Sequence, residues 1–255
     1  MARGIEYCPV AAGVEVVGDR WTLLLVRELL LGSYRFNDIH RGLPGISRTL
    51  LSARLRRLQL HGVVIRVLDD QDRPEYRLTP AGAALQDLVW QLGDWARRWT
   101  FGDPEDEQLD AGSALWRLRQ FVCRDHLPAR RVTIEFIVHS TTEERGWLVL
   151  TPEEVSACRQ HPGYDTDLWV TGDLRELHRL VAGTSTIEIA TGSDRLRLAG
   201  EPELVTGFPR WFSWRNPMNS QQPTRITEGE IDQSHRSFAD TNISRCRPTS
   251  GSTDA

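Results

Sequence analysis

The sequence predicts an α+β protein with two folded domains and a disordered tail. Three observations predict this organisation. Apolar residues recur at helical spacing through most of residues 1–103, with one short β-branched segment among them. In residues 104–214, strand-like segments alternate with helical ones, which is typical of a small α/β domain. In residues 215–255, large apolar side chains are few and polar ones dominate, so we expect this segment to be disordered.

The first domain opens with two helices. Asp19 or Thr22 can cap a helix over residues 21–30, which ends before Gly32. A short second helix is expected over residues 33–41. A turn with two glycines and a proline follows, and it separates this pair from the next helix.

The third helix carries residues that could contact a nucleic acid. Ser47 caps this helix, which runs to His61 and turns Leu51, Leu55 and Leu58 toward the core in one stripe. The opposite face holds small hydroxyls and arginines, which can enter the major groove, donate to base edges and hold phosphates. The candidates are Ser47 at the helix start and, along the helix, Arg48, Thr49, Ser52, Ala53, Arg56 and Arg57.

The charge of the chain differs between regions. All 31 basic side chains are arginine, and against 35 carboxylates they leave a net charge of -4. Residues 30–66 nevertheless contain seven arginines against the single acid Asp38, a local charge of +6. A basic segment inside an acidic protein is typical of a nucleic-acid contact, and a solvated helix face is the alternative.

A hairpin and a long helix complete the first domain. Residues 63–68 are β-branched, residues 69–74 form a turn, and residues 75–78 return as a partner strand. A hairpin directly after a recognition helix is a wing, so we predict a winged helix-turn-helix.

The long helix begins at Thr79-Pro80 and has an apolar seam with alternating spacings of three and four residues. The seam residues are Leu85, Leu88, Leu92, Trp95 and Trp99. A dimer contact is favoured because two-fold DNA sites match two-fold proteins. Packing of the seam on the first helix is the alternative.

The second domain shows mixed patterns. Strands are expected over residues 132–138, 147–150, 168–170 and 196–198. Thr151-Pro152 and the following acids predict a helix through Arg159. Gly172-Asp173 opens a further helix, and a last helix ends near Trp214.

The ordered motifs of the first domain resemble the HxlR family of winged helix-turn-helix regulators. They are residues 7–10 (YCPV), 18–21 (GDRW), 36–39 (FNDI), 45–47 (GIS), 51–58 (LSARLRRL), 61–62 (HG), 75–76 (EY) and 78–82 (LTPAG). The resemblance implies a cytoplasmic homodimer that binds double-stranded DNA and controls transcription, with repression as the family tendency. It also implies that the helix from Ser47 enters the major groove and that Arg73 at the wing probes the minor groove. The neighbouring carboxylates Asp69, Asp70 and Asp72 would repel phosphate, so the helix is the stronger prediction.

Cys8 is a redox candidate by the same resemblance, because some family members use a cysteine at this position to sense oxidants. A thiol directly before Pro9 at a helix start has its thiolate favoured by the helix dipole. The alternative is that Cys8 is inert packing.

The second domain resembles the small α/β domain of sterol-carrier-like proteins through residues 131–138, 147–154, 167–171 and 196–205. This resemblance implies an apolar cavity for a hydrophobic small molecule, which would modulate operator binding. Six aromatic residues could line the cavity or form plain core: Trp116, Phe136, Trp147, Trp169, Phe208 and Trp211.

An enzyme is not expected. The motifs of serine hydrolases, phosphate-binding loops, zinc proteases and dinucleotide-binding folds are absent from the sequence, and without lysine no Schiff base can form. We expect no catalytic residues, cofactor, metal or membrane span. The scattered cysteines and the lack of a secretory signal favour a reducing cytoplasm. The alternative function is a lipid-binding or interaction module whose winged helix serves only dimerisation.

Overall fold

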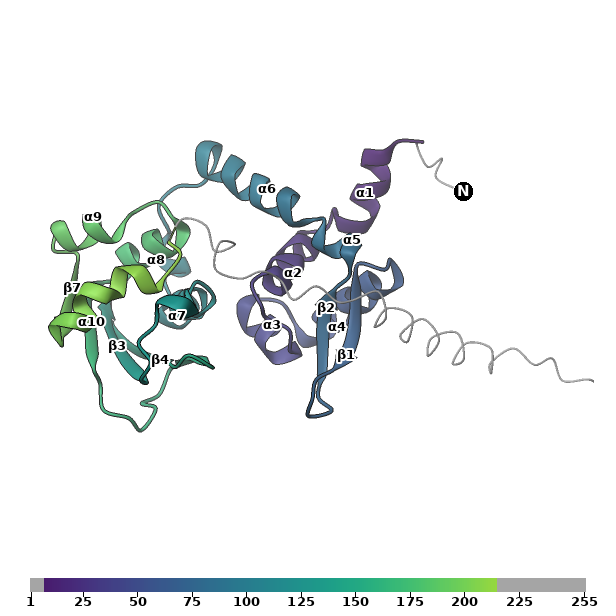
Figure 1. Ribbon diagram of the computed structural model, residues 1–255. Helices are drawn as coiled ribbons and strands as arrows, with labels where there is room; N and C mark the ends of the chain where they lie inside the picture. Colours follow the sequence, from purple (N-terminus) through teal and green to yellow (C-terminus); the bar gives the residue numbers. More distant parts are fainter. Residues whose placement is uncertain (1–6, 215–255) are drawn as a thin grey trace, which may run out of the picture.

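The computed structural model describes residues 7–214 and shows two domains joined by a long helix and a linker (Figure 1). The tail predicted over residues 215–255 lies outside the described residues. Within the described part, no helix has the length and apolar character needed to cross a membrane.

Four helices form the body of the first domain, and side-chain caps fix two of their starts. They are α1 (Pro9–Val17), α2 (Arg20–Leu30), α3 (Phe36–Gly42) and α4 (Arg48–Leu60). The Asp19 carboxylate accepts the Trp21 N–H at 3.0 Å and begins α2. Ser47 Oγ accepts the Leu50 N–H at 3.2 Å and begins α4. Both caps confirm the starts that the sequence predicts, because an N-cap acts only on its own first turn.

The hairpin after α4 is the predicted wing. Strand β1 (Val64–Leu68) pairs antiparallel with β2 (Pro74–Leu78). The Tyr76 N–H donates to Tyr34 O at 2.8 Å, which fastens the hairpin to the segment before α3. The core beneath these elements contains the buried side chains of Leu25, Val26, Leu29, Ile39, Leu51, Leu55, Leu58 and Val64.

The helix expected from Thr79-Pro80 is divided into α5 (Pro80–Ala83) and α6 (Gln86–Trp99). Thr79 Oγ1 accepts the Gly82 N–H, and a Cβ on Gly82 would lie 2.1 Å from Val63 O. The short helix therefore presses against the hairpin, and the chain turns before it continues. Helix α6 then leaves the first domain and leads toward the second (Figure 1).

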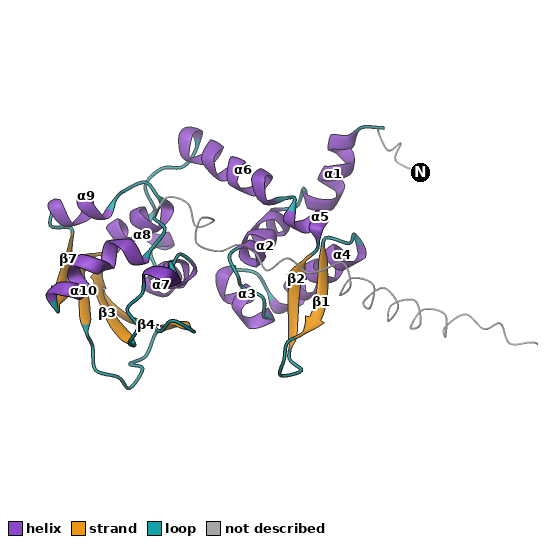
Figure 2. Ribbon diagram, in the orientation of Figure 1, coloured by secondary structure: helices purple, strands orange, loops and turns teal. Residues whose placement is uncertain are grey.

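The second domain is built on one five-stranded mixed sheet in the order β5-β4-β3-β6-β7. Its strands are β3 (Val132–His139), β4 (Glu143–Leu150), β5 (Val155–Cys158), β6 (Leu168–Asp173) and β7 (Leu196–Gly200). Its α-helices are α7 (Ala111–Gln120), α8 (Leu174–Ala182), α9 (Ile187–Gly192) and α10 (Pro202–Gly207). Short 3-10 turns lie at Asp106–Gln108, Arg124–His126 and Phe208–Trp211. Figure 2 shows the strands with these helices packed around them.

Alternation along the strands gives the sheet two different faces. Ile134, Phe136 and Val138 of β3 are fully buried and share one core with α7, α8 and α10. Glu135 points to the opposite face, where it pairs in register with Trp147 on one side and Trp169 on the other. Only the first face is therefore part of the helix-covered core.

The helix predicted from Thr151 to Arg159 is wrong. Thr151 Oγ1 accepts the Glu154 N–H at 2.9 Å, and the Thr151 N–H donates to Glu154 O at 2.8 Å. The chain makes one turn and then continues as β5, which pairs with β4 through Val155↔Leu150. The capping residues are real, but pairing with the neighbouring strand outweighs continued helix.

Candidate nucleic-acid interface

Helix α4 presents two chemically different faces. Leu51, Leu55 and Leu58 are 0–1% exposed, as the predicted stripe requires. The predicted contact residues on the other side are all exposed: Ser47, Arg48, Thr49, Ser52, Ala53, Arg56 and Arg57. One helix therefore joins the core of the domain to an outer surface of polar and small side chains, with the exposed Leu60 at its C-terminal end.

Three arginines keep their charge on this surface. Arg48 donates to the neutral Asn37 amide at 3.0 Å, and Arg57 donates to the backbone carbonyl of Glu15. These contacts orient the guanidinium groups without neutralising them. Arg56 makes no hydrogen bond or ion pair with any other residue of the described part, so its charge faces solvent.

Two other arginines of the basic segment are neutralised by carboxylates. Arg54 Nε lies 3.4 Å from Asp19 Oδ1, at the start of α2. Arg35 pairs with Asp69 at 3.0 Å and with Glu75 at 3.7 Å. The local charge counted along the sequence is therefore larger than the charge available to a phosphate.

The wing turn is organised by Asp69. Its Oδ1 accepts the N–H groups of Gln71 and Arg73 at 2.9 Å each, and its Oδ2 accepts from the side chains of Arg73 and Arg35. These hydrogen bonds, led by the Arg73 N–H, lower the pKa of Asp69 from 3.8 to about 2. Asp69 is thus a structural carboxylate, whereas Arg73 is exposed but shares its charge with Asp69.

Arg35 and Asn37 were missed as site residues by the sequence analysis. Arg35 holds the wing to the start of α3, and Asn37 holds Arg48 at the start of α4. Arg35 lies 34 residues from Asp69 and Asn37 lies 11 from Arg48, so no local pattern pairs them.

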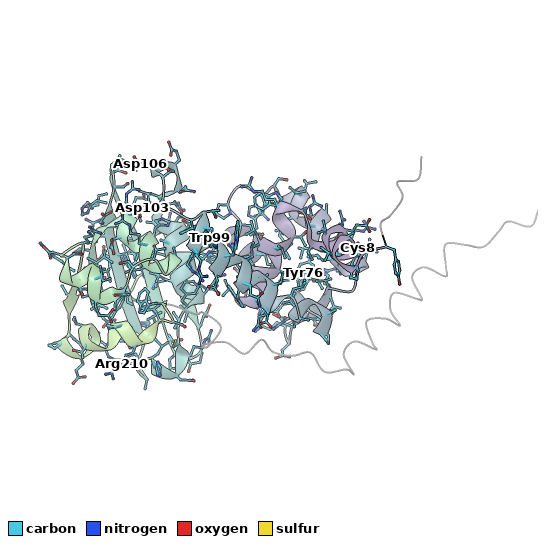
Figure 3. The ribbon with its side chains drawn as sticks, turned by 90° about the horizontal axis from the view of Figure 1, so that it is seen from above. Cys8, Tyr76, Trp99, Asp103, Asp106 and Arg210 are labelled. Carbon is cyan, nitrogen blue, oxygen red and sulfur yellow. The ribbon has the colours of Figure 1, made fainter. Side chains whose placement is uncertain are left out.

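The seam on α6 is largely exposed. Only Leu85 packs against the first-domain core, while the exposed fractions of Leu88, Leu92, Trp95 and Trp99 are 47%, 47%, 54% and 68%. Seen from above, Trp99 lies between the two domains (Figure 3). Packing on the first helix therefore accounts for little of the seam.

Cys8 is half-buried at the N-cap of α1, directly before Pro9. Its side chain makes no capping hydrogen bond. Figure 3 places it at the end of the first domain that is remote from the second domain.

The six candidate pocket aromatics lie in three places. Phe136, Phe208 and Trp211 belong to the helix-covered core. Trp147 contacts His161 edge-on and lies with Trp169 on the opposite sheet face. Trp116 lies beneath Arg41 and Arg119, toward α3. No single cavity can therefore contain all six. Among residues 7–214, His, Cys, Asp and Glu side chains form no group of three that could hold a metal ion.

The winged hairpin, the exposed basic helix and the buried leucine stripe together define a DNA-binding transcriptional regulator. Residues 16–103 match the family model described as HxlR-like helix-turn-helix. The chain is 40% identical over 97 residues to YvaP, an uncharacterized HTH-type transcriptional regulator of Bacillus subtilis, which covers 37% of this chain and 90% of YvaP.

A second relative is an uncharacterized HTH-type transcriptional regulator of Mycobacterium tuberculosis. It is 36% identical over 143 residues, which covers 54% of this chain and 85% of that relative. Among solved structures, the redox regulator HypR in its reduced form is 32% identical with a TM-score of 0.33, covering 36% of this chain and 92% of HypR. The chain belongs to the HxlR-like helix-turn-helix family.

The role of Asp69 predicts an acid-dependent loss of stability. Because its pKa is lowered on folding, its contribution is complete above the ordinary value of 3.8 and is lost as the pH falls toward about 2. Asp69→Asn should therefore lower the melting temperature at pH 7. The difference in melting temperature between this variant and the unaltered protein should shrink between pH 4 and 2. Thermal unfolding of both proteins between pH 2 and pH 7 measures this difference. Asp70→Asn, at an exposed neighbour in the same turn, is the control and should have little effect; a pH-independent difference for Asp69→Asn would contradict the assignment.

Proposed function

We propose that the protein is a dimeric repressor that contacts its operator through α4. The observation that carries this proposal is the outer face of α4, where Arg48, Arg56 and Arg57 keep their charges around the small residues Thr49, Ser52 and Ala53. Small side chains let the helix approach base edges, and guanidinium groups can contact guanine or phosphate. Ser47 lies at the helix N-terminus, where backbone N–H groups favour an anion.

The wing makes a smaller contribution in this proposal. Arg73 is exposed and can reach a groove, but its pairing with Asp69 weakens the attraction to phosphate. Exposed Asp70 and Asp72 flank it. The balance of charge therefore favours α4 as the main contact.

We infer that α6 forms the dimer contact. Leu88, Leu92, Trp95 and Trp99 follow one side of the helix and are about half or more exposed. Val10 and Val14 of α1 add further exposed apolar surface, 73% and 58% exposed. Exposed apolar side chains along a helix are typical of a protein contact, and a two-fold axis would place two α4 helices for two half-sites.

We further propose that a hydrophobic small molecule bound in the second domain modulates operator binding. The candidates that lie together are Phe136, Phe208 and Trp211, with the rings of Phe208 and Trp211 centred 6.1 Å apart. The likeness to sterol-carrier domains stays a prediction. The alternative trigger is oxidation of Cys8, supported by its place before Pro9 at the start of α1.

The DNA contact is tested with Arg56→Ala. The side chain has no partner within residues 7–214, so the fold should be unchanged while operator affinity falls by about 5- to 150-fold. The slope of affinity against salt should also decrease by about one. Fluorescence anisotropy with a duplex selected from a random library by the unaltered protein measures both. Arg197→Ala, at an exposed arginine of β7, is the matched control. Equal affinities of the two variants would contradict the contact through Arg56, and failure of the unaltered protein to select any duplex would favour the interaction-module alternative.

The dimer contact is tested with Trp95→Arg. An exposed position tolerates the charge in a monomer, whereas burying it at a two-fold interface should weaken the dimer by about 2 kcal/mol or more per subunit. Light scattering after size exclusion gives the mass. Trp169→Arg places the same substitution on the exposed sheet face and should leave the dimer intact. A dimer that survives Trp95→Arg would remove α6 as the contact.

The two triggers are separated by one pair of measurements. Native mass spectrometry of protein from its source organism should show a co-purified hydrophobic mass, and Cys8→Ser should respond to hydrogen peroxide as the unaltered protein does. An empty second domain together with an oxidant response that Cys8→Ser abolishes would reverse the choice between ligand and redox control.

A further inference from the structure

A buried carboxylate joins the two domains. Glu28 of α2 is 0% exposed. Its Oε1 accepts from Arg27 at 2.8 Å and from Arg117 Nη1 at 2.5 Å, and its Oε2 accepts from Gln120 Nε2 at 2.8 Å. Arg117 and Gln120 belong to α7 of the second domain, so this cluster crosses the domain boundary.

The same α7 residues contact two further groups of the first domain. Arg117 Nη2 donates to Gly42 O at 2.7 Å, and Gln120 Nε2 donates to Ser33 Oγ at 3.0 Å. Gly42 is the last residue of α3, where carbonyl groups lack helical partners. A cation at a helix C-terminus is favourable. Arg117 thus caps α3 from outside its own domain.

Packing at Gly42 leaves no room for a side chain at this position. A Cβ on Gly42 would lie 1.9 Å from Glu28 Oε2 and 2.9 Å from Trp116 Nε1. Arg41, the residue before it, lies over the Trp116 ring at 5.0 Å. The end of α3 is therefore held between α2 and α7, as the side-by-side placement of α3 and α7 in Figure 1 also shows.

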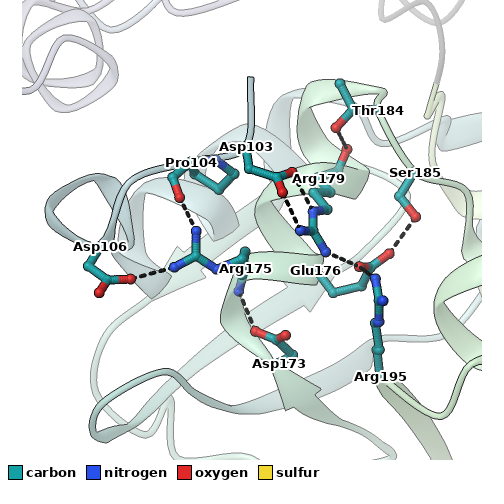
Figure 4. Close-up of polar contacts among 10 residues, drawn as sticks. All are labelled: Asp103, Pro104, Asp106, Asp173, Arg175, Glu176, Arg179, Thr184, Ser185 and Arg195. Carbon is teal, nitrogen blue, oxygen red and sulfur yellow. Dashed lines mark hydrogen bonds and ion pairs between the residues drawn. The ribbon is translucent and has the colours of Figure 1, made fainter. Parts of the chain in front are cut away.

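The linker gives the second domain another fixed point. Asp103 pairs with Arg179 through both carboxylate oxygens, at 2.9 and 2.7 Å, and Arg175 contacts Pro104 O and Asp106 (Figure 4). Glu176, 0% exposed, holds Arg179 from the other side. Two separate attachments restrict rotation of the second domain about the end of α6.

The contacts of Arg117 and Gln120 with the first domain, which form the junction of the two domains, lie close to the start of α4. Five residues lie between Gly42 and Arg48, and two of them, Leu43 and Ile46, are buried. Because these two side chains are anchored in the core, a shift at the end of α3 would also displace the start of α4. Arg48 is in turn held by Asn37 of α3, so its guanidinium group follows α3 as well.

We propose that Arg117 and Gln120 of the second domain are positioning residues for DNA recognition, which act through Glu28 and Gly42 on the start of α4. The inference rests on the proposed DNA contact of α4. It assigns the second domain a direct part in operator selectivity, in addition to any ligand that it binds. A ligand that moves α7 would alter DNA binding through these contacts.

The test compares Arg117→Met with the double variant Glu28→Gln/Arg117→Met. The single variant removes one counter-charge of the buried carboxylate, so its melting temperature should fall. The double variant also removes the carboxylate charge, which leaves Arg27 without its acidic partner, so its melting temperature should fall further. Both variants lack the contact to Gly42 O equally. Arg197→Met, far from the junction on exposed β7, is the matched control.

Affinity for the selected duplex and for an unrelated duplex is measured for each variant. The ratio of the two affinities should fall about tenfold or more in both Arg117 variants, because a charge-assisted hydrogen bond is lost. Hydrogen exchange at the amides of residues 43–51 should rise in parallel. An affinity ratio that falls further in the double variant, in step with its melting temperature, would show that Arg117 only stabilises the fold, and the inference would be overturned.

The two proposals fail in different ways. If Arg56→Ala weakens binding while Arg117→Met changes neither the affinity ratio nor exchange, the DNA contact stands and the positioning role is wrong. If the unaltered protein selects no duplex, the DNA contact is wrong and the positioning role falls with it.

Discussion

The carboxylate of Glu28 is inaccessible to solvent, and its hydrogen-bond donors come from both domains. An ionised group removed from water must be paired and hydrogen-bonded, since an unpaired charge there is strongly destabilising. Arg27, Arg117 and Gln120 are consequently confined to positions around it. This confinement brings α7 against α2 and the end of α3, so the two domains share a polar centre between their separate apolar cores.

Arginine serves several purposes in this lysine-free chain. Arg117 compensates a buried carboxylate and Arg35 fastens the wing, whereas Arg56 stays unpaired within the described part. A guanidinium group suits all three purposes because it is always charged and its donors form a rigid fork. The charge that is free of carboxylate partners on the outer face of α4 thus comes from a subset of the basic residues, and neither the net charge nor the local charge along the sequence measures it.

Much of the first domain could be predicted because its signals are local. Asp19 and Ser47 cap the helices that they precede, and the leucine stripe of α4 faces the core at helical spacing. The second domain is harder to predict from sequence, because its elements depend on pairing between distant strands. Its Thr151 cap signal was correct locally, yet strand pairing ended the helix after one turn. Aromatic residue type alone does not show which candidates share a cavity, because strand alternation places Phe136 and Trp169 on opposite faces of the sheet.

The sequence by itself determined the winged helix-turn-helix, the face of α4 that is exposed and the apolar seam of α6, because each depends on residues within a few positions of one another. Tertiary structure alone decided which arginines of the basic segment are paired with carboxylates and how the second domain is attached. Those outcomes depend on partners such as Arg117 and Glu28, which are 89 residues apart. Their pairing is set by the packing of whole helices, so the spacing of residues along the chain cannot predict it.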